Sequence, residues 1–294
     1  MNELKLIEIF CKSHDFCQKL DKYSQTYLLP NSSQASALSL SEIMSICIAF
    51  HLSGYKTFKH FYSSLVLPEW KAYFPNLVSY SHFVQLQQGT ILPLYAFLWS
   101  ECLGQCQGLS FIDSFKLAVC HNRRIFSHKV FYGLAARGKT SVDWFYGFKL
   151  HMSINTKGEV LGFALSKGNT DDRNRSMLKQ VTRLLKGILV GDKGYIGKAL
   201  KEDLAQEGIH LLTKIKVNMK NALLDPLHKL FLKKRALIES VIDRIKETTS
   251  IEHSRHKSPV NFLVNTFAAL AAYNFIEDKP HLHFVKAEIA YLPQ

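Results

Sequence analysis

The sequence predicts an α/β fold, a mixed β-sheet flanked by helices, preceded by an all-α N-terminal domain. Two observations lead to this prediction. The first hundred residues contain apolar residues at helical spacing, separated by short polar breaks. From about residue 106, segments with apolar residues at every second position alternate with amphipathic helical segments. This order is typical of a sheet covered by helices, so we expect a helical domain over 1–105 and an α/β domain over 106–294.

The N-terminal domain is predicted to contain two helices separated by a short break. The first follows Ser39 or Ser41, either of which can cap a helix, and Ser53-Gly54 interrupts the pattern. A helical pattern resumes over 56–66. The spacing fits a DNA-binding helix-turn-helix, and it fits an ordinary helical hairpin within a bundle equally well.

The C-terminal domain is predicted to contain five strands, with helices between the later ones. The first helix begins near Asp171 or Asp172, which suit a helix N-terminus, and ends before Gly187. The predicted strands cover 108–120, 144–155, 160–166, 188–192 and 209–215. The predicted helices cover 171–187, 197–208 and 227–248.

Charge is distributed unevenly along the chain. The formal net charge is +13 at pH 7. Residues 1–105 hold seven basic and seven acidic side chains, whereas residues 106–294 hold thirty basic and seventeen acidic ones. This excess favours a polyanionic partner, nucleic acid first. A membrane surface is the weaker interpretation, because no strongly basic amphipathic helix stands alone.

Neither a signal peptide nor a membrane-spanning segment is expected. The N-terminus carries acidic residues where a signal peptide would be basic. The longest apolar run, 262–276, is too short to cross a bilayer and contains Asn265 and Asn274, so we interpret it as a buried helix. The six cysteines have no paired CxxC spacing, and Cys102 and Cys106 are interpreted as core residues in preference to zinc ligands. We therefore expect a cytoplasmic protein with no membrane partner.

Two acidic residues stand where a lone charge is hard to explain. Asp113 lies on the apolar face of the strand 108–120, where a charge needs a partner, a cation or a proton. Asp192 ends the strand 188–192, and functional groups gather at strand ends in α/β sheets, although Asp before Gly also suits a simple turn. If these two strands are adjacent, the two carboxylates converge.

A third carboxylate is expected from the helix over 227–248. On a helical wheel, Glu239 lies at the margin of the apolar face, with Arg235 and Lys246 within about 40° of it. A plain surface position is the alternative for Glu239, and Asp243, one turn later, is a rival. Three carboxylates around one point repel each other unless divalent cations bind there. In a basic chain, this combination favours metal-dependent phosphoryl chemistry.

Three motifs resemble bacterial insertion-sequence transposases of the DDE type, whose catalytic domain has the RNase H-like fold. "SFIDS" around Asp113, "VGDKGYIG" around Asp192 and "RALIESVIDRIK" around Glu239 are similar to the three acidic motifs of that family. Further similarity, to insertion sequence family 982, extends over nearly the whole chain. It runs through "VSYSHFVQLQ", "VCHNRR", "GFKLH", "GNTDDR", "NMKN" and "HSRHKS".

The C-terminal signature of the wider superfamily is Tyr, two residues, Arg, three residues, Glu, six residues and Lys. Arg235, Glu239 and Lys246 fit this spacing, which selects Glu239 over Asp243. Leu232 stands in the place of the Tyr. This departure removes no metal ligand and concerns substrate positioning.

The resemblance implies a DNA transposase that cleaves the ends of its insertion sequence and joins the 3′-OH ends to target DNA. Asp113, Asp192 and Glu239 would hold two Mg²⁺ ions, for which Mn²⁺ can substitute, in a two-metal phosphoryl transfer. The implied partners are double-stranded DNA, both terminal inverted repeats and target, and a second copy of the chain, because two ends must be joined in one event. If the N-terminal pair of helices is a helix-turn-helix, it would bind the ends. The implied location is the nucleoid of a bacterial cytoplasm.

Basic residues near the three carboxylates are candidates for DNA contact. Arg235 and Lys246 are assigned to phosphates near the scissile bond. Each candidate also has a simpler interpretation as part of a solvated positive surface, but neutralising several phosphates would make binding salt-dependent. The candidates are Arg235, Lys246, Lys193, Lys149, His151, Arg123 and Arg124.

Two other functions stay open at this level. One is a catalytically inactive DNA-binding protein derived from a transposase, against which the presence of all three acidic residues argues. The other is a host RNase H-like structure-specific nuclease. A hydrolase triad of Ser114, His151 and an Asp lacks a nucleophile elbow to support it.

Overall fold

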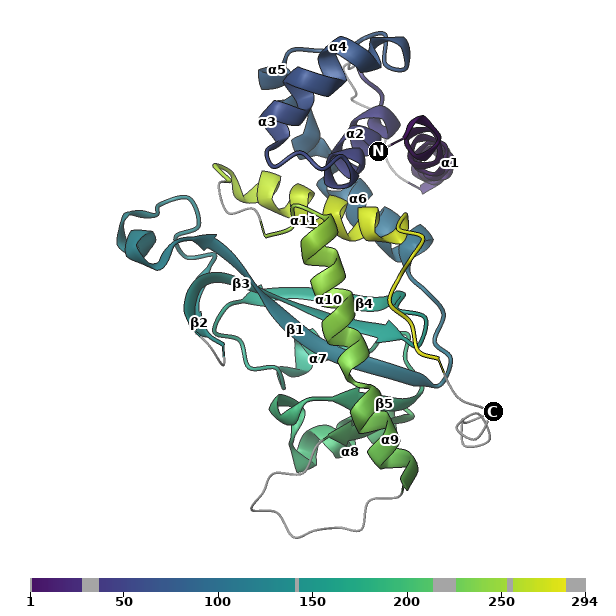
Figure 1. Ribbon diagram of the computed structural model, residues 1–294, viewed down its shortest axis with the longest axis vertical. Helices are drawn as coiled ribbons and strands as arrows, with labels where there is room; N and C mark the ends of the chain where they lie inside the picture. Colours follow the sequence, from purple (N-terminus) through teal and green to yellow (C-terminus); the bar gives the residue numbers. More distant parts are fainter. Residues whose placement is uncertain (1, 28–36, 141–142, 214–225, 253–255, 284–294) are drawn as a thin grey trace. The chain divides into compact units, whose positions relative to one another are not determined.

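The chain forms two compact units, which we describe separately. The computed structural model describes residues 2–27, 37–140, 143–213, 226–252 and 256–283 (Figure 1). The first unit consists of Met1–Cys102 with Ile245–Glu277, and the second of Leu103–Arg244 with Asp278–Gln294. Residues 245–252 and 256–277, predicted to belong to the C-terminal domain, lie in the first unit. The domain limits at 105 and 106 stay a prediction.

The first unit is helical throughout its described part. Its core forms where α2 (Leu40–Leu52) and α11 (Pro259–Asn274) pack against each other, and α1 (Glu3–Tyr27) packs against α2. The apolar run expected to be a buried helix is α11, which is buried along most of its length. The shorter helical segments are α3 (Phe58–Phe61), η1 (Tyr62–Val66), α4 (Leu67–Glu69), η2 (Trp70–Ala72), α5 (Tyr80–Leu86), η3 (Gln87–Thr90), α6 (Ile91–Phe97) and η4 (Leu98–Cys102).

Local sequence fixes both ends of α2. Ser39 is the N-cap: its hydroxyl accepts from the N–H of Glu42, while the Glu42 carboxylate accepts from the N–H of Ser39 at 2.6 Å. This capping box decides between the two serines that the sequence offers. At the other end, Gly54 adopts φ of +78°, a conformation that favours glycine and directs the chain away from the helix. A helix-turn-helix role for this pair of helices stays a prediction.

The second unit is built on one six-stranded sheet. β3 pairs antiparallel with β1 on one edge and with β2 and β4 on the other. β1 also pairs with β5, and β5 with β6, and both of these pairs are parallel. Three long antiparallel strands, with the short β2 also paired to β3, are followed by two parallel strands, which gives the RNase H-like mixed sheet. The strands are β1 (Leu109–Cys120), β2 (Ala136–Lys139), β3 (Trp144–Asn155), β4 (Val160–Lys167), β5 (Gly187–Gly191) and β6 (Ile209–Thr213).

Helices cover this sheet, as the α/β prediction requires. α7 (Arg175–Val181) packs on β4 and β3, and α8 (Lys198–Gln206) packs on β6. α9 (Pro226–Lys234) contacts β6 and leads into α10 (Ala236–Thr248). The apolar side chains that join α7 and α8 to the sheet form one buried cluster. It includes Ile112, Leu161, Leu178, Val181, Leu189, Leu200 and Leu204.

Four features of the second unit differ from the sequence prediction. The short strand β2 was not predicted, because four residues are too few to show a two-residue period. α7 begins only after the N-cap Asn174, whose side chain accepts from the N–H of Met177, so the expected start at Asp171 or Asp172 is wrong. α7 also ends at Val181, short of the expected end before Gly187. The helix expected over 227–248 is divided at Arg235. The predicted end of the last strand, at residues 214–215, lies outside the described residues.

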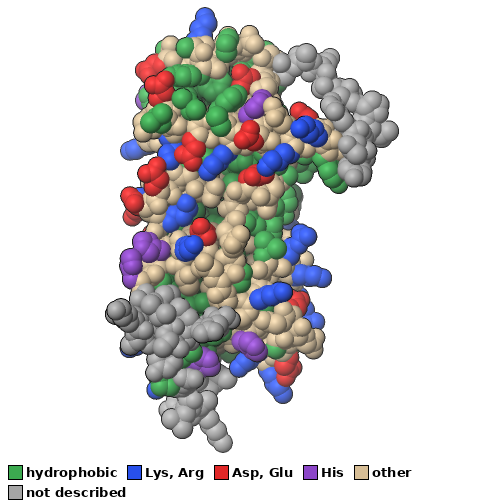
Figure 2. Space-filling model, turned by 90° about the vertical axis from the view of Figure 1, so that its right-hand side faces the viewer, with side chains coloured by type: hydrophobic (Ala, Val, Ile, Leu, Met, Phe, Trp, Pro, Cys, Tyr) green, Lys and Arg blue, Asp and Glu red, His purple; other side chains and the backbone are tan. Residues whose placement is uncertain are grey.

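Charged side chains are mixed on the face of the molecule shown in Figure 2. Lys and Arg side chains lie among Asp and Glu side chains there and do not gather into one basic patch. Among the described helices, none is both long enough and apolar enough to cross a membrane.

Candidate active site

Strand register brings the first two predicted carboxylates to the same level of the sheet. β1 and β5 pair in parallel, which meets the condition of adjacency stated for these two strands, and Phe111 lies opposite Val190. Asp113 and Asp192 each follow two residues after that pair. Because a step of two residues returns a side chain to the same face, both carboxylates leave the sheet at one position.

Asp113 is held by two donors. Its Oδ1 accepts from the N–H of Ser114 at 2.8 Å, and its Oδ2 accepts from Nη1 of Arg235 at 3.1 Å. The carboxylate is 21% exposed, so it lies mostly out of water but is reachable by a ligand. Asp192 caps the short helical turn that follows β5, because its Oδ1 accepts from the N–H of Gly194 at 2.7 Å. Both acids thus combine a structural contact with an accessible oxygen.

The division between α9 and α10 places a cation between two acids. Arg235 forms the turn between these helices, and its guanidinium donates to Asp113 with Nη1 and to Glu239 with Nη2. The side chain of Arg235 is 16% exposed, whereas that of Glu239 is 53% exposed. Arg235 therefore joins the acid on β1 to the acid on the first turn of α10. Asp243, the rival for this role, is exposed one turn further along the helix.

Burial and neighbouring charge disfavour the ionised form of Asp113. The pKa of Asp113 is raised to about 6, mainly by burial and also by the carboxylates of Asp192 and Glu239, against the Ser114 N–H and the Arg235 guanidinium, which lower it. The mutual effect of the three acids follows from their proximity. Such a group of carboxylates gains free energy from any positive charge that reaches it.

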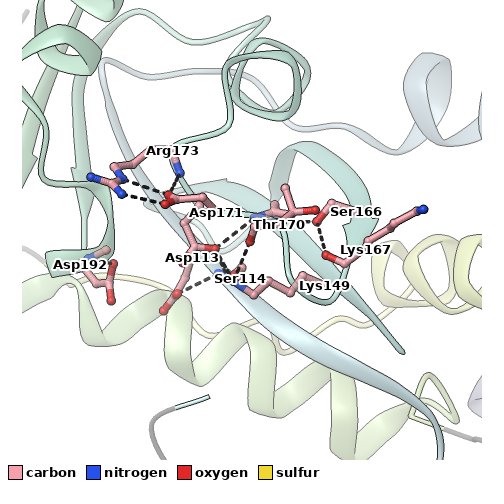
Figure 3. A network of polar contacts seen from close by, with 12 residues as sticks. Asp113, Ser114, Lys149, Ser166, Lys167, Thr170, Asp171, Arg173 and Asp192 are labelled. Carbon is pink, nitrogen blue, oxygen red and sulfur yellow. Dashed lines mark hydrogen bonds and ion pairs between the residues drawn. The ribbon is translucent and has the colours of Figure 1, made fainter. Parts of the chain in front are cut away.

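A fourth acid, Asp172, organises a network beside Asp113 and Asp192. Figure 3 labels two members of this network, Ser114 and Lys149, near Asp113. Oδ1 of Asp172 accepts from the Ser114 hydroxyl at 3.1 Å and from Nζ of Lys149 at 3.1 Å. Nδ1 of His151 lies 3.7 Å from the same oxygen, and Nε2 of His151 is 2.8 Å from the Ser166 hydroxyl. Ser114 thus donates to Asp172 and not to His151, so no hydrolase triad is assembled here.

Asp172 also approaches Asp192. A Cβ atom on Gly194 would lie 2.9 Å from Oδ1 of Asp192 and 3.3 Å from Oδ2 of Asp172. The two carboxylates therefore border one small space that only a glycine leaves open. Tyr195, next in the chain, is buried, and its hydroxyl has no hydrogen-bond partner among the described residues. Burial raises the pKa of Tyr195 well above its usual value, and the charges of Asp172, Asp113 and Asp192 add to this effect.

A polar cavity of about 430 Å³ adjoins this group of acids. The bidentate pair of Arg173 with Asp171 lies at its wall, with N–O distances of 2.9 and 2.7 Å, and holds the pKa of Asp171 well below its usual value. Cations from four separate segments of the chain line the cavity together with acids. The charged lining residues are Lys139, Lys149, Asp171, Asp172, Arg173 and Lys193.

The donor chemistry of the site suits hard divalent cations, which prefer carboxylate oxygens. Among the described residues, however, no group of three His, Cys, Asp or Glu side chains has the geometry of a metal site. Arg235 explains the difference, since its guanidinium occupies the space between Asp113 and Glu239. The residues therefore fit a cation in charge and ligand type, and Asp113 and Glu239 would be free to bind it only once Arg235 leaves the space between them.

The predicted DNA-contact residues fall into two groups. Lys193, Arg123 and Arg124 are exposed and available to a phosphate. The others are engaged within the protein: Lys149 with Asp172, Arg235 with two acids, Lys246 with Glu252 at 3.6 Å, and His151 in a fully buried position. The pKa of His151 is lowered to about 4, mainly by burial and also by the charge of Lys149, although Asp172 raises it. A neutral buried ring at this position orients its neighbours and does not meet solvent.

The sequence analysis did not select Asp172 and Tyr195 as site residues. The signal for Asp172 was present, because it belongs to the "GNTDDR" motif and two adjacent acids follow the end of a predicted strand. They were interpreted as the start of a helix. The buried, unpartnered hydroxyl of Tyr195 leaves no sequence signal.

The family is decided by a sequence match that covers most of the second unit and extends into residues of the first. The family described as "Transposase DDE domain" matches residues 103–259, which is more than half of the 294 residues. The chain belongs to the DDE transposase family. The matched range contains the three predicted acids as well as Asp172 and Arg235. No curated protein sequence matches this DDE transposase.

Two solved transposase structures show remote likeness. A piggyBac transposase synaptic complex with hairpin DNA is 11% identical with a TM-score of 0.36, and the match covers 74% of this chain and 52% of that one. This DDE transposase thus spans about half the length of the piggyBac chain. A Mos1 mariner paired-end complex with Mn is 11% identical with a TM-score of 0.24, covering 89% and 86% of the two chains. The family assignment depends on the sequence match and not on these two structures.

Proposed function

We propose that this DDE transposase cleaves the ends of a bacterial insertion sequence of family 982 and joins the 3′-OH ends to target DNA. The observation that supports this proposal is the convergence of Asp113, Asp192 and Glu239 on one position of the sheet, from three distant parts of the sequence. The proposed partners are double-stranded DNA, at the terminal repeats and at the target, and a second copy of the chain. The proposed location is the bacterial nucleoid.

Asp113, Asp192 and Glu239 are the proposed ligands of two Mg²⁺ ions, which Mn²⁺ can replace. When bound, such ions stabilise the charge that develops on the attacking and leaving oxygens of an in-line phosphoryl transfer. Asp113 offers an oxygen that the Ser114 N–H already orients, and Asp192 is oriented by the Gly194 N–H. Arg235 keeps the acids close together before the ions bind, and it can then turn to a phosphate of the DNA.

Lys193 and the network around Asp172 have proposed roles in holding the substrate. Lys193 is exposed beside Asp192 and lines the polar cavity, so it can meet a phosphate next to the scissile bond. Lys149 and His151 act on the substrate through Asp172, because both are engaged with it inside the protein. Direct contact of these two side chains with DNA would require Asp172 to release them.

The test of this proposal replaces the acid that follows β5 and the acid on the first turn of α10, and compares them with a control on the same helix. Asp192→Asn and Glu239→Gln should abolish Mg²⁺-dependent cleavage of DNA that carries the terminal repeats, while circular dichroism shows an unchanged fold. Asp243→Asn is the matched control, since this exposed acid on α10 should be dispensable. Cleavage that survives Asp192→Asn would overturn the assignment.

The same assay distinguishes the two alternatives. A catalytically inactive transposase-derived protein would bind the terminal DNA and would not cleave it with Mg²⁺ or Mn²⁺. A host RNase H-like nuclease would cut branched DNA and would join no strands. An active transposase cleaves the terminal DNA and joins its 3′-OH ends to target DNA. Target DNA labelled on one strand detects the joined product directly.

A further inference from the structure

The segment that connects β1 to β3 carries large aromatic side chains that are unusually exposed to solvent. We call residues 121–139 together with Trp144 the aromatic hairpin. Figure 1 shows the part between β1 and β2 extending beyond the end of the sheet. Phe126 is 99% exposed, Tyr132 86% and Trp144 44%. Aromatic rings that are this exposed to water have a free-energy cost, which a binding partner would remove by covering them.

The aromatic hairpin is anchored, so this exposure does not come from a poorly packed loop. Phe131 is fully buried, and the ring of His128 stacks on it with centroids 5.6 Å apart. The Tyr146 hydroxyl donates to the carbonyl of Phe131 at 3.1 Å. Nζ of Lys167 donates to the carbonyl of Gly133 at 2.9 Å. Inward residues hold the backbone in place while the others point to solvent.

Cations accompany the exposed rings. The guanidinium carbon of Arg137 lies 5.0 Å from the centroid of the Trp144 ring, and Nζ of Lys139 lies 5.6 Å from it. Arg123 and Arg124 lie in the same short helical turn as Phe126, Asn122–Ser127, and are exposed. Residues 121–144 contain five Lys or Arg and a single acidic residue, Asp143. A ring and a cation side by side fit a nucleotide, which has a flat base and a negative phosphate.

The aromatic hairpin is also continuous with the candidate active site. Lys139, whose ammonium group lies near Trp144, lines the polar cavity together with Asp172 and Lys193. A DNA strand in that cavity can therefore continue to the aromatic hairpin. In intact duplex DNA the base faces are stacked on each other, so they become available to aromatic side chains only where the duplex is open.

We propose that the aromatic hairpin binds unpaired nucleotides of the DNA, with Phe126, Tyr132 and Trp144 stacking on bases and the neighbouring arginines holding phosphates. This inference rests on the proposed DNA function and specifies the form of DNA that the site receives. A second copy of the chain is the other candidate occupant, but two hairpins of the same strong positive charge repel each other.

The test compares the affinities of three DNA probes by fluorescence anisotropy. The probes are a short oligodeoxythymidine, the same strand with abasic sites in place of its bases, and a blunt duplex. Replacing Phe126 and Tyr132 with alanine should lower affinity for the oligodeoxythymidine by about tenfold or more for each ring removed. Affinities for the abasic strand and for the blunt duplex should stay close to those of the wild type, because the phosphates are unchanged.

Two further variants complete the design. Arg123→Ala should weaken binding of all three probes and reduce the salt dependence of binding, since it removes a phosphate contact. Leu92→Ala is the matched control for loss of an exposed apolar side chain, because Leu92 is 74% exposed in the first unit. It should change no affinity. All the aromatic positions are exposed, so loss of folding is not expected.

Other results would overturn the inference. Equal loss of affinity for base-bearing and abasic strands would show that the rings do not stack on bases. If the alanine variants of Phe126 and Tyr132 kept the DNA affinity of the wild type but sedimented as monomers where the wild type is a dimer, the aromatic hairpin would be assigned to self-association. A wild-type protein that cleaves terminal DNA but binds the oligodeoxythymidine no better than the abasic strand would refute the hairpin's role alone. A wild-type protein that binds no DNA would refute the proposed function as well.

Discussion

Replacement of Arg235 tests the electrostatics of the candidate site. The guanidinium donates to Asp113 and to Glu239, and Arg235→Ala leaves both acids without the cation between them. A hydrogen bond between charged groups in a largely buried position contributes about 1.5–3 kcal/mol, and this applies to the Asp113 contact. The Glu239 side chain is 53% exposed, so its contact contributes about 0.2–1 kcal/mol. We expect Arg235→Ala to lower the free energy of unfolding by about 2–4 kcal/mol.

Urea denaturation at neutral pH without divalent cations measures this loss. Arg235→Lys should recover part of it, because an ammonium group keeps the charge but cannot reach two acids with a planar fork. Arg173→Ala is the control, since Arg173 makes a bidentate pair with Asp171 in which the side chains are 51% and 55% exposed. We expect the control to lose much less free energy of unfolding than Arg235→Ala, because solvent screens an exposed ion pair.

Added Mg²⁺ supplies the result that would refute the reasoning. A ligand that binds only the folded state raises stability, and acids freed from Arg235 should bind Mg²⁺ more tightly than paired ones. Mg²⁺ should therefore stabilise Arg235→Ala more than the wild type. If Mg²⁺ stabilised neither protein, or if Arg235→Ala and Arg173→Ala lost the same free energy, the acids would not form one cation-binding group.

Four other outcomes follow from the structure. The pKa of His151 is lowered to about 4, mainly by burial, so the neutral ring contributes stability that is fully present above about pH 6.5 and is lost as the pH falls toward 4. His151→Gln should therefore flatten this part of the curve of unfolding free energy against pH, measured by urea denaturation. Tyr195→Phe should raise the free energy of unfolding by about 1 kcal/mol, because it removes a buried hydroxyl without a partner, and a loss of stability would reveal a partner instead. Gly147→Ala should destabilise by several kcal/mol or prevent folding, since its Cβ would lie 2.1 Å from the carbonyl oxygen of Leu117 on β1; soluble expression and thermal melting report this. Ser39→Ala should cost about 1 kcal/mol in thermal melts through loss of the α2 cap, and an unchanged melting temperature would contradict the capping box.

The sequence predicted the long elements of the sheet well because their patterns are long. β3 occupies the predicted range 144–155, and β1 and β4 differ from prediction by one residue at one end. A strand of eight to twelve residues repeats its two-residue period several times, so the pattern is distinctive. β2 is too short to repeat it, and its existence depends on pairing with β3.

The sequence was sufficient to select the acids of the candidate site, but it did not predict which side chains contact them. Asp113 and Asp192 could be selected because a charge on an apolar strand needs a reason, and the parallel pairing of β1 with β5 supplies the geometry. The break at Arg235 could not be foreseen, since the helical spacing continues on both sides of it without Pro or Gly. The contacts of His151 and Lys149 with Asp172 could not be foreseen either, because they depend on where the loop that carries Asp172 folds back onto β3.

The pairing of β1 with β5 has a consequence for how this protein can change over evolutionary time. The loops and helices between these strands can gain or lose residues without separating Asp113 from Asp192, because the ladder of hydrogen bonds alone sets their level. A single residue inserted within either strand, after the last paired position, would turn one carboxylate to the opposite face of the sheet. Length variation should therefore be common between the two acids and rare within the few residues that lead to each.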